Sequence, residues 1–341
     1  MDALKRWILW TSGLLLLIGL MGCQSGEADR ANKTAETHAQ DLAQVSVMLD
    51  WYPNAVHSYL YVAQEKGYFE QEGVEVEFLF PANPTDPIQL AAAGEITLGI
   101  TYQPDVIMAR AKGIPVKTVA AIVREPLNHI VFLDQTLQSP AQLEGKRVGY
   151  PGIPVNESLL KTMVETSGGD FHQVELIDVG FDLGAALISG QADAIIGAYI
   201  NHEVPVLKQQ GYTVHTFNPV DYGVPPFYEL VLVTSDTVWS EQEEIIRSFF
   251  RAAQKGYHYM KENPEESLDI LLAHQDEAQF PLIREVEKES LTILLPKMEA
   301  AGAPFGSQRK EEWQTVINWL LESGFINEAP AVDEIFINLV E

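Results

Sequence analysis

The chain has 341 residues, a net charge of −26 and a single cysteine, Cys23. A chain this negative is not expected to bind nucleic acid or anionic lipid, and one cysteine excludes an internal disulfide framework. The length is more than one hydrophobic core supports, so we expect two lobes held together by packing alone.

The first 22 residues are typical of a secretory signal. Lys5 and Arg6 precede an apolar run that is short for a membrane span. The run ends in Leu-Met-Gly-Cys23, which resembles the bacterial lipobox, where a lipid is attached to the cysteine and the signal is removed. We therefore expect residues 1–22 to be a signal peptide and Cys23 to anchor the chain at the extracytoplasmic face of the cell membrane. An ordinary signal peptide or an uncleaved anchor is the alternative.

Residues 23–44 are polar and predict a flexible tether. After the tether, short runs rich in β-branched residues predict strands at 45–49, 74–80, 96–100, 116–123, 129–133, 147–150, 174–179, 194–197, 213–217 and 229–233. Apolar residues at helical spacing predict helices between them, among others at 59–71, 86–93, 105–112 and 157–166.

Strands that alternate with helices of this length predict an α/β fold with mostly parallel sheets and helices on both faces. The alternation starts again near Pro126. From Ser240, which we expect to be a helix N-cap, only helices follow. The sequence therefore predicts two α/β lobes followed by a helical C-terminal region.

Five segments resemble one family: 49–78, 90–122, 143–160, 193–203 and 223–236. The first contains Leu-Asp-Trp-Tyr-Pro-Asn followed by His57 and, further on, Glu-Lys-Gly-Tyr-Phe. Together they resemble the solute-binding lipoproteins of ABC importers that are related to the fungal thiamine-pyrimidine synthases and to sulfonate-binding proteins. The resemblance covers roughly residues 45–270.

This resemblance implies a two-lobed, type II periplasmic-binding-protein-like fold with the ligand in the interlobe cleft. Lobe one would comprise 45–125 plus 235–341, and lobe two 126–234. The implied function is capture of a thiamine-related pyrimidine, formylaminopyrimidine or hydroxymethylpyrimidine. The ligand would pass unchanged to a membrane permease with a cytoplasmic ATPase. We expect a monomer with no cofactor and no catalytic activity.

In lobe one, the candidate ligand contacts follow two predicted strands at their carboxyl ends, where ligands bind in such sheets. Trp51 could stack on a planar ring, or it could be a loop residue that covers the core. Asn54 offers both a donor and an acceptor, or serves the turn. His57 could bind the ligand or cap the following helix. Tyr102 stands in the same topological position after the strand at 96–100.

In lobe two, segment 151–156 joins a strand to a helix. Gly152 would let the backbone approach a ligand and Pro154 would stiffen the loop. Asn156 is expected to be the N-cap of a helix whose free N–H groups could donate to a ligand oxygen.

Further along lobe two, Tyr199 is a second candidate for ring stacking. Glu203 and Glu229 are the carboxylates expected to accept hydrogen bonds from an aminopyrimidine, and Tyr228 would form a wall of the site. The alternative for either glutamate is a solvated surface carboxylate.

The candidate loops at 50–58, 150–157, 199–203 and 222–229 contain no Lys or Arg. Their aromatic, amide and carboxylate groups suit a neutral or weakly basic heteroaromatic ligand. A sulfonate- or taurine-type anion-binding protein is the alternative function. A pyrimidine-synthase-like enzyme would need a reactive lysine and histidine in the cleft.

Overall fold

The computed structural model describes residues 42–278 and 281–340. The expected signal peptide, most of the tether and Cys23 lie outside these residues. The tether was expected to extend to residue 44, but β1 (Ala43–Met48) already includes Ala43 and Gln44, which pair with Val74 and Glu75. Within the described residues, no helix is both long and apolar enough to span a bilayer.

The first sheet has the strand order β2-β1-β3-β10-β4. Its strands are β1 (Ala43–Met48), β2 (Val74–Leu79), β3 (Leu98–Thr101), β10 (Leu230–Ser235) and β4 (Val116–Val123). β1 runs parallel to β2 and β3, whereas β10 runs antiparallel to both of its neighbours. Every residue of β10 is buried, as expected for an apolar strand inside a sheet.

The second sheet has the order β7-β6-β8-β5-β9. Its strands are β7 (Glu175–Asp178), β6 (Arg147–Tyr150), β8 (Ala194–Tyr199), β5 (Asn128–Phe132) and β9 (His215–Phe217). β6 is parallel to β7 and β8, and β5 is antiparallel to β8 and β9. Each predicted strand therefore exists, and both sheets are mixed, with four strands in one direction and one reversed strand in each.

The reversed strands mark the two places where the chain passes between the sheets. It crosses first between Val123 and Asn128, and again between Phe217 and Leu230. Because β10 pairs with β3 and β4, it belongs to the first sheet, although the expected second lobe extended to residue 234. The division of the chain into lobes otherwise stays a prediction.

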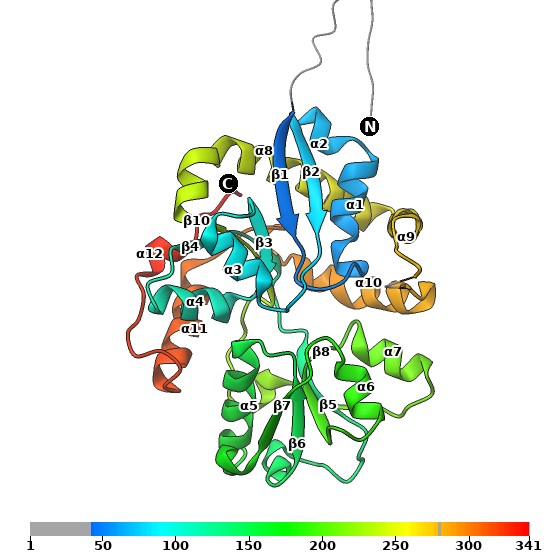
Figure 1. The fold of residues 1–341 in the computed structure, drawn as a ribbon, viewed down its shortest axis with the longest axis vertical. Helices are drawn as coiled ribbons and strands as arrows, with labels where there is room; N and C mark the ends of the chain where they lie inside the picture. Colours follow the sequence, from blue (N-terminus) through cyan, green and yellow to red (C-terminus); the bar gives the residue numbers. More distant parts are fainter. Residues whose placement is uncertain (1–41, 279–280, 341) are drawn as a thin grey trace, which may run out of the picture. The chain divides into compact units, whose positions relative to one another are not determined.

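Helices flank both sheets, and Figure 1 shows α5, α6 and α7 grouped with β5 to β8, apart from the group that contains β1 to β3. The α-helices are α1 (Ser58–Glu65), α2 (Tyr68–Gln71), α3 (Asp86–Ala93), α4 (Gln103–Ala111), α5 (Pro154–Thr166), α6 (Leu183–Ile188), α7 (Glu203–Gln209), α8 (Asp236–Glu262), α9 (Pro264–Ala273), α10 (Arg284–Met298), α11 (Lys310–Glu322) and α12 (Val332–Ile335).

The helices expected at 105–112 and 157–166 begin two to three residues earlier, as α4 and α5, and two other predicted helices differ more from the observed ones. The helix expected at 59–71 is divided into α1 and α2, because the backbone at Gly67 is left-handed with φ of 66°. The helix expected to begin at Ser240 begins earlier, at Asp236, where Ser235 is the N-cap and accepts a hydrogen bond from the Val238 N–H. The helix leaves helical geometry at Gln242, close to the expected start.

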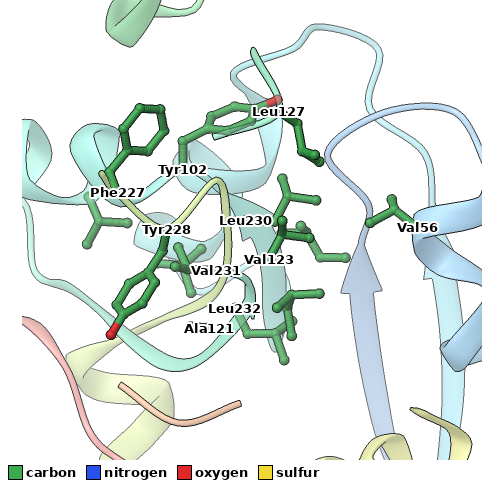
Figure 2. Close-up of a cluster of buried hydrophobic side chains, with 14 of the residues drawn as sticks. Val56, Tyr102, Ala121, Val123, Leu127, Phe227, Tyr228, Leu230, Val231 and Leu232 are labelled. Carbon is green, nitrogen blue, oxygen red and sulfur yellow. The ribbon is translucent and has the colours of Figure 1, made fainter. Parts of the chain in front are cut away.

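The two crossing segments pack against each other. Apolar side chains around them, including Val123, Leu127 and Leu230, form a buried cluster (Figure 2). The backbone of Gln103 donates to the Tyr228 carbonyl, and its side-chain oxygen accepts from the Tyr228 N–H. The space between the sheets therefore has a closely packed base.

Candidate functional site

A small cavity lies between the two sheets, beside the carboxyl ends of β1, β3 and β8. Its volume is about 20 Å³, and it is lined by Asp50, Trp51, Asn54, Val56, Tyr102, Gly197, Tyr199, His202 and Glu203. A volume of this order holds about one water molecule. The structure thus brings together five predicted site residues: Trp51, Asn54, Tyr102, Tyr199 and Glu203.

Trp51 lines the cavity and also packs against the other half of the molecule. One half contains the first sheet, and the other half contains the second. Its ring centroid is 4.4 Å from that of Phe181 in an edge-to-face arrangement, and the centroids of Tyr52 and Phe181 are 4.8 Å apart. Phe181 was missed by the sequence analysis. The available signal was its position three residues after β7, at a carboxyl end.

Asn54 and His57 complete a hydrogen-bonded turn around the short helix η1 (Ala55–His57). The Asn54 side-chain oxygen accepts from the Val56 N–H, and His57 Nδ1 accepts from the Asn54 N–H. His57 Nε2 lies 2.9 Å from Asp50 Oδ1, and both side chains are buried. Because Nδ1 accepts, Nε2 carries the proton and donates to Asp50. His57 is not among the residues that line the cavity, and Asn54 lines it with an amide already engaged in the turn.

The hydroxyl-bearing rings of Tyr102 and Tyr199 enter the cavity from opposite sheets. Burial raises the pKa of both phenols well above the usual value, and the nearby carboxyls of Asp50 and Glu229 raise it further. Both rings therefore remain neutral donors at physiological pH. The Tyr199 hydroxyl has no hydrogen bond of standard length to any residue that the structure describes.

Glu203 is the predicted carboxylate that lines the cavity. It lies in the first turn of α7, and its Oε2 accepts from the Tyr199 N–H at 2.6 Å. The neighbouring His202 also lines the cavity and was not singled out from the sequence. No lysine or arginine is among the lining residues. The lining therefore offers carboxylate acceptors, phenol donors and aromatic faces.

Glu229, the other predicted ligand carboxylate, lies at the base of the site instead. Its Oε2 accepts from the backbone N–H groups of Leu127 (2.6 Å) and Asn128 (3.0 Å), so it ties one crossing segment to the other. These N–H groups are buried and need an acceptor, which explains the placement. Burial raises the pKa of Glu229 to about 7, while the two backbone donors lower it. Its Oε1 has no hydrogen bond of standard length to a described residue, but the Tyr199 hydroxyl is near enough to lower the pKa of this carboxyl as well.

Tyr228 does not form a wall of the cavity. Figure 2 shows its hydroxyl pointing away from Tyr102. That hydroxyl accepts from the Arg309 N–H at 2.8 Å and also contacts Glu312. Tyr228 therefore joins the second crossing segment to the C-terminal helices, because its neighbours there supply both a donor and a carboxylate.

The segment 151–156 contributes none of its predicted side chains to this cavity. Asn156 is not the N-cap of α5, because the helix begins at Pro154 with Ile153 as N-cap. The Asn156 side chain instead accepts from Asn128 Nδ2 at 2.6 Å. Gly152 lies beside the carboxylate of Asp178, and Pro154 lies at a second cavity.

Gly197, which the sequence analysis missed, is the point at which β8 meets this segment. Its φ is 96°, and a Cβ placed there would lie 2.6 Å from Pro151 Cδ. Only glycine permits this approach, so the residue keeps segment 151–156 against the cavity wall.

The chain is similar to proteins of one family over most of its length. The sequence profile described as NMT1/THI5-like matches residues 54–267. A formylaminopyrimidine-binding protein of Halalkalibacterium halodurans is 54% identical over 329 residues, which cover 96% of this chain and 97% of that protein. A 4-amino-5-hydroxymethyl-2-methylpyrimidine phosphate synthase of Legionella pneumophila is 27% identical over 250 residues, covering 72% and 78% of the two chains.

Among solved structures, the alkanesulfonate-binding protein SsuA of Xanthomonas axonopodis pv. citri, bound to MOPS, has a TM-score of 0.70. It is 15% identical and covers 88% of this chain and 100% of its own. At this identity the similarity concerns the fold alone. It confirms the expected α/β architecture of periplasmic binding proteins, with two sheets flanked by helices.

Proposed function

Because this chain belongs to the NMT1/THI5-like family, as its sequence predicted, we propose that it is the solute-binding component of an ABC importer for a thiamine-related pyrimidine. The expected ligands are formylaminopyrimidine and hydroxymethylpyrimidine. One observation carries the proposal: the 54% identity to a formylaminopyrimidine-binding protein extends over nearly the whole of both chains. The lining of the cavity supports it independently.

The ring of such a ligand would lie between Trp51 of one half and Tyr199 of the other. Aromatic stacking contributes about 0.5–1.5 kcal/mol beyond the burial of apolar area. The Glu203 carboxylate would accept from the exocyclic amine, and the hydroxyls of Tyr102 and Tyr199 would donate to ring nitrogens or to the side group.

A ring needs more room than the present 20 Å³. Trp51 and Phe181, which meet across the two halves, would therefore separate to admit the ligand and close over it, as in hinge closure of two-lobed binding proteins. The hinge would lie at the crossing segments tied by Glu229.

The same lining argues against the two alternatives. A sulfonate or taurine needs donors for a full negative charge, whereas the cavity is lined by Asp50 and Glu203 and by no lysine or arginine. A synthase needs a reactive lysine, and none lines the cavity either. The ligand would therefore be released chemically unaltered.

The membrane attachment completes the proposal. Cys23 would carry a lipid after removal of residues 1–22, and the polar tether would hold the binding domain at the extracytoplasmic face of the membrane. There a monomer would deliver its ligand to a permease driven by a cytoplasmic ATPase.

Isothermal titration calorimetry with three ligands tests this function. We expect formylaminopyrimidine or hydroxymethylpyrimidine to bind with a Kd of about 10 nM to 10 µM, and methanesulfonate not to bind at about 10 mM. Binding of methanesulfonate without binding of either pyrimidine would favour the anion-binding alternative.

A further inference from the structure

A carboxylate of one half of the molecule caps a helix of the other. Asp105 lies in the first turn of α4, and its Oδ1 accepts a hydrogen bond from the Val155 N–H at 3.2 Å. Val155 is the second residue of α5, which flanks the second sheet. The Asp105 side chain is only 6% exposed, so this contact is made away from solvent.

Nothing in the segment that leads into α5 could make the same contact. The N-cap residue is Ile153, which has no side-chain acceptor, and Pro154 has no N–H. The Asn156 N–H is directed to the Ile153 carbonyl. The N-terminus of this 13-residue helix carries partial positive charge and is a place where proteins bind anions. Here a carboxylate of the chain itself occupies that place.

In the part of the chain that the structure describes, the second oxygen of this carboxylate is unpartnered, and Asp105 also lines a cavity. Asp105 Oδ2 is buried and has no hydrogen-bond partner among residues 42–278 and 281–340. Asp105, Ile153 and Pro154 line a cavity of about 190 Å³ between α3, α4 and the start of α5, and Lys112 is the one cation among the described residues that line it.

Tyr102 lines both this cavity and the small cavity of the proposed pyrimidine site. Gly197, which also lines the small cavity, packs against Pro151 just ahead of this helix. A substituent on a ring held in the small cavity would therefore lie on the side of the N-terminus of α5.

We propose that Asp105 is a specificity-determining residue: its carboxylate occupies the anion position at the N-terminus of α5 and so excludes ligands that carry a phosphate or sulfonate group. This inference rests on the proposed function and sharpens it, because it restricts the ligand to the uncharged pyrimidine and rejects the phosphate ester of the same ring. An anionic substituent would have to displace Asp105 from the Val155 N–H or remain beside a buried like charge, and both are unfavourable.

The test compares hydroxymethylpyrimidine with its phosphate monoester in calorimetric titrations of the full chain and of Asp105→Asn and Asp105→Ala. The titrations are run at pH 8.5, because burial and the nearby Glu229 raise the pKa of Asp105 to about 7, while the Val155 N–H and Lys112 lower it. We expect the wild-type chain to prefer the uncharged ligand by about 100-fold or more.

Asp105→Asn keeps an oxygen for the Val155 N–H and removes the charge, so the preference should fall by about 10-fold. Asp105→Ala leaves the N–H free, so the preference should fall further, and inorganic sulfate should bind with a Kd of about 1–10 mM although it does not bind the wild-type chain. Glu157→Gln is the matched control, because it removes an exposed charge from the same turn of α5 and should leave the preference unchanged.

An unchanged preference in both Asp105 variants would overturn the inference, as would a wild-type chain that binds the phosphate ester as tightly as the uncharged pyrimidine. If the wild-type chain binds neither pyrimidine, the proposed function fails. The sulfate titration then decides the role of Asp105 alone: binding by Asp105→Ala supports it, and no binding refutes it. Asp105→Asn preserves the shape of the side chain and keeps the test valid if the alanine variant fails to fold.

Discussion

Two segments border the space between the sheets, and they present different kinds of atoms to it. Segment 50–57 presents side chains, and Asp50, Trp51, Asn54 and Val56 all line the small cavity. Segment 151–156 presents its backbone, through the Val155 N–H that Asp105 caps. Both follow the carboxyl end of a parallel strand. The strand that a loop follows therefore decides at which edge of the sheet the loop lies. The conformation of the loop decides which of its atoms a ligand can contact.

The largest effect that separates the two segments concerns ligand affinity. Trp51→Ala should weaken pyrimidine binding by about 100-fold, close to 3 kcal/mol, because it removes both ring stacking and buried apolar area. Pro154→Ala, the matched change in the other segment, should alter the Kd by less than about 3-fold, since Pro154 does not line the small cavity. Calorimetry on both variants measures the contrast, and equal losses would contradict it.

The second effect concerns the contact that positions segment 151–156. Gly197→Ala should lower the free energy of unfolding by about 3 kcal/mol, because the added Cβ would lie 2.6 Å from Pro151 Cδ at a φ of 96°. Gly184→Ala in α6, where a Cβ meets nothing within 4 Å, should instead stabilise by about 0.5–1 kcal/mol. Urea unfolding of both variants tests this difference, and a neutral Gly197→Ala would show that the approach is not tight.

The third effect concerns Glu229, which ties the two crossing segments at the base of the site. Burial raises the pKa of Glu229 to about 7 from an ordinary value of 4.5. The folded chain therefore holds this proton more strongly than the unfolded chain. The resulting stabilisation is complete below about pH 4.5 and is lost as the pH rises through 7.

Between pH 5 and 8, the free energy of unfolding should consequently fall by about 2 kcal/mol more in the wild-type chain than in Glu229→Gln. Urea titrations at four pH values measure this difference, with Glu157→Gln as the control for loss of an exposed charge. Parallel pH profiles for wild type and Glu229→Gln would show that Glu229 is ionised throughout the range.

The smallest effect concerns Asn54. Its side-chain oxygen caps η1 through the Val56 N–H, so Asn54→Ala should lower the free energy of unfolding by about 1 kcal/mol. Since the amide is engaged within the turn, pyrimidine affinity should change by less than about 3-fold. A large loss of affinity with unchanged stability would instead make Asn54 a direct ligand contact.

The strands and most helices could be predicted from the sequence because they depend on local patterns. Alternating or continuous apolar runs located every strand, including β10. The partners of β10 could not be predicted in this way, because its apolar run fits either sheet and only the path of the chain selects the first. The break at Gly67 is likewise one backbone conformation inside a pattern that is helical throughout.

Within the site, the sequence predicted the aromatic residues better than the charged ones. Trp51, Tyr102 and Tyr199 line the small cavity at strand ends, as expected. Glu229 and His57 are used by the protein itself, because buried N–H groups and a buried Asp50 demand partners that no local pattern reveals. The partnership of Asp105 with Val155 spans 50 residues and depends on the contact between the two halves.

The central claim is that a flat, nitrogen-bearing ring is captured between these aromatic side chains and released unchanged. Native mass spectrometry of the chain purified from cells grown with thiamine breakdown products tests it most directly. We expect a bound species with the mass of an intact, unphosphorylated aminopyrimidine, and we expect Trp51→Ala to lack it. A bound sulfonate, or a pyrimidine of altered mass, would contradict it.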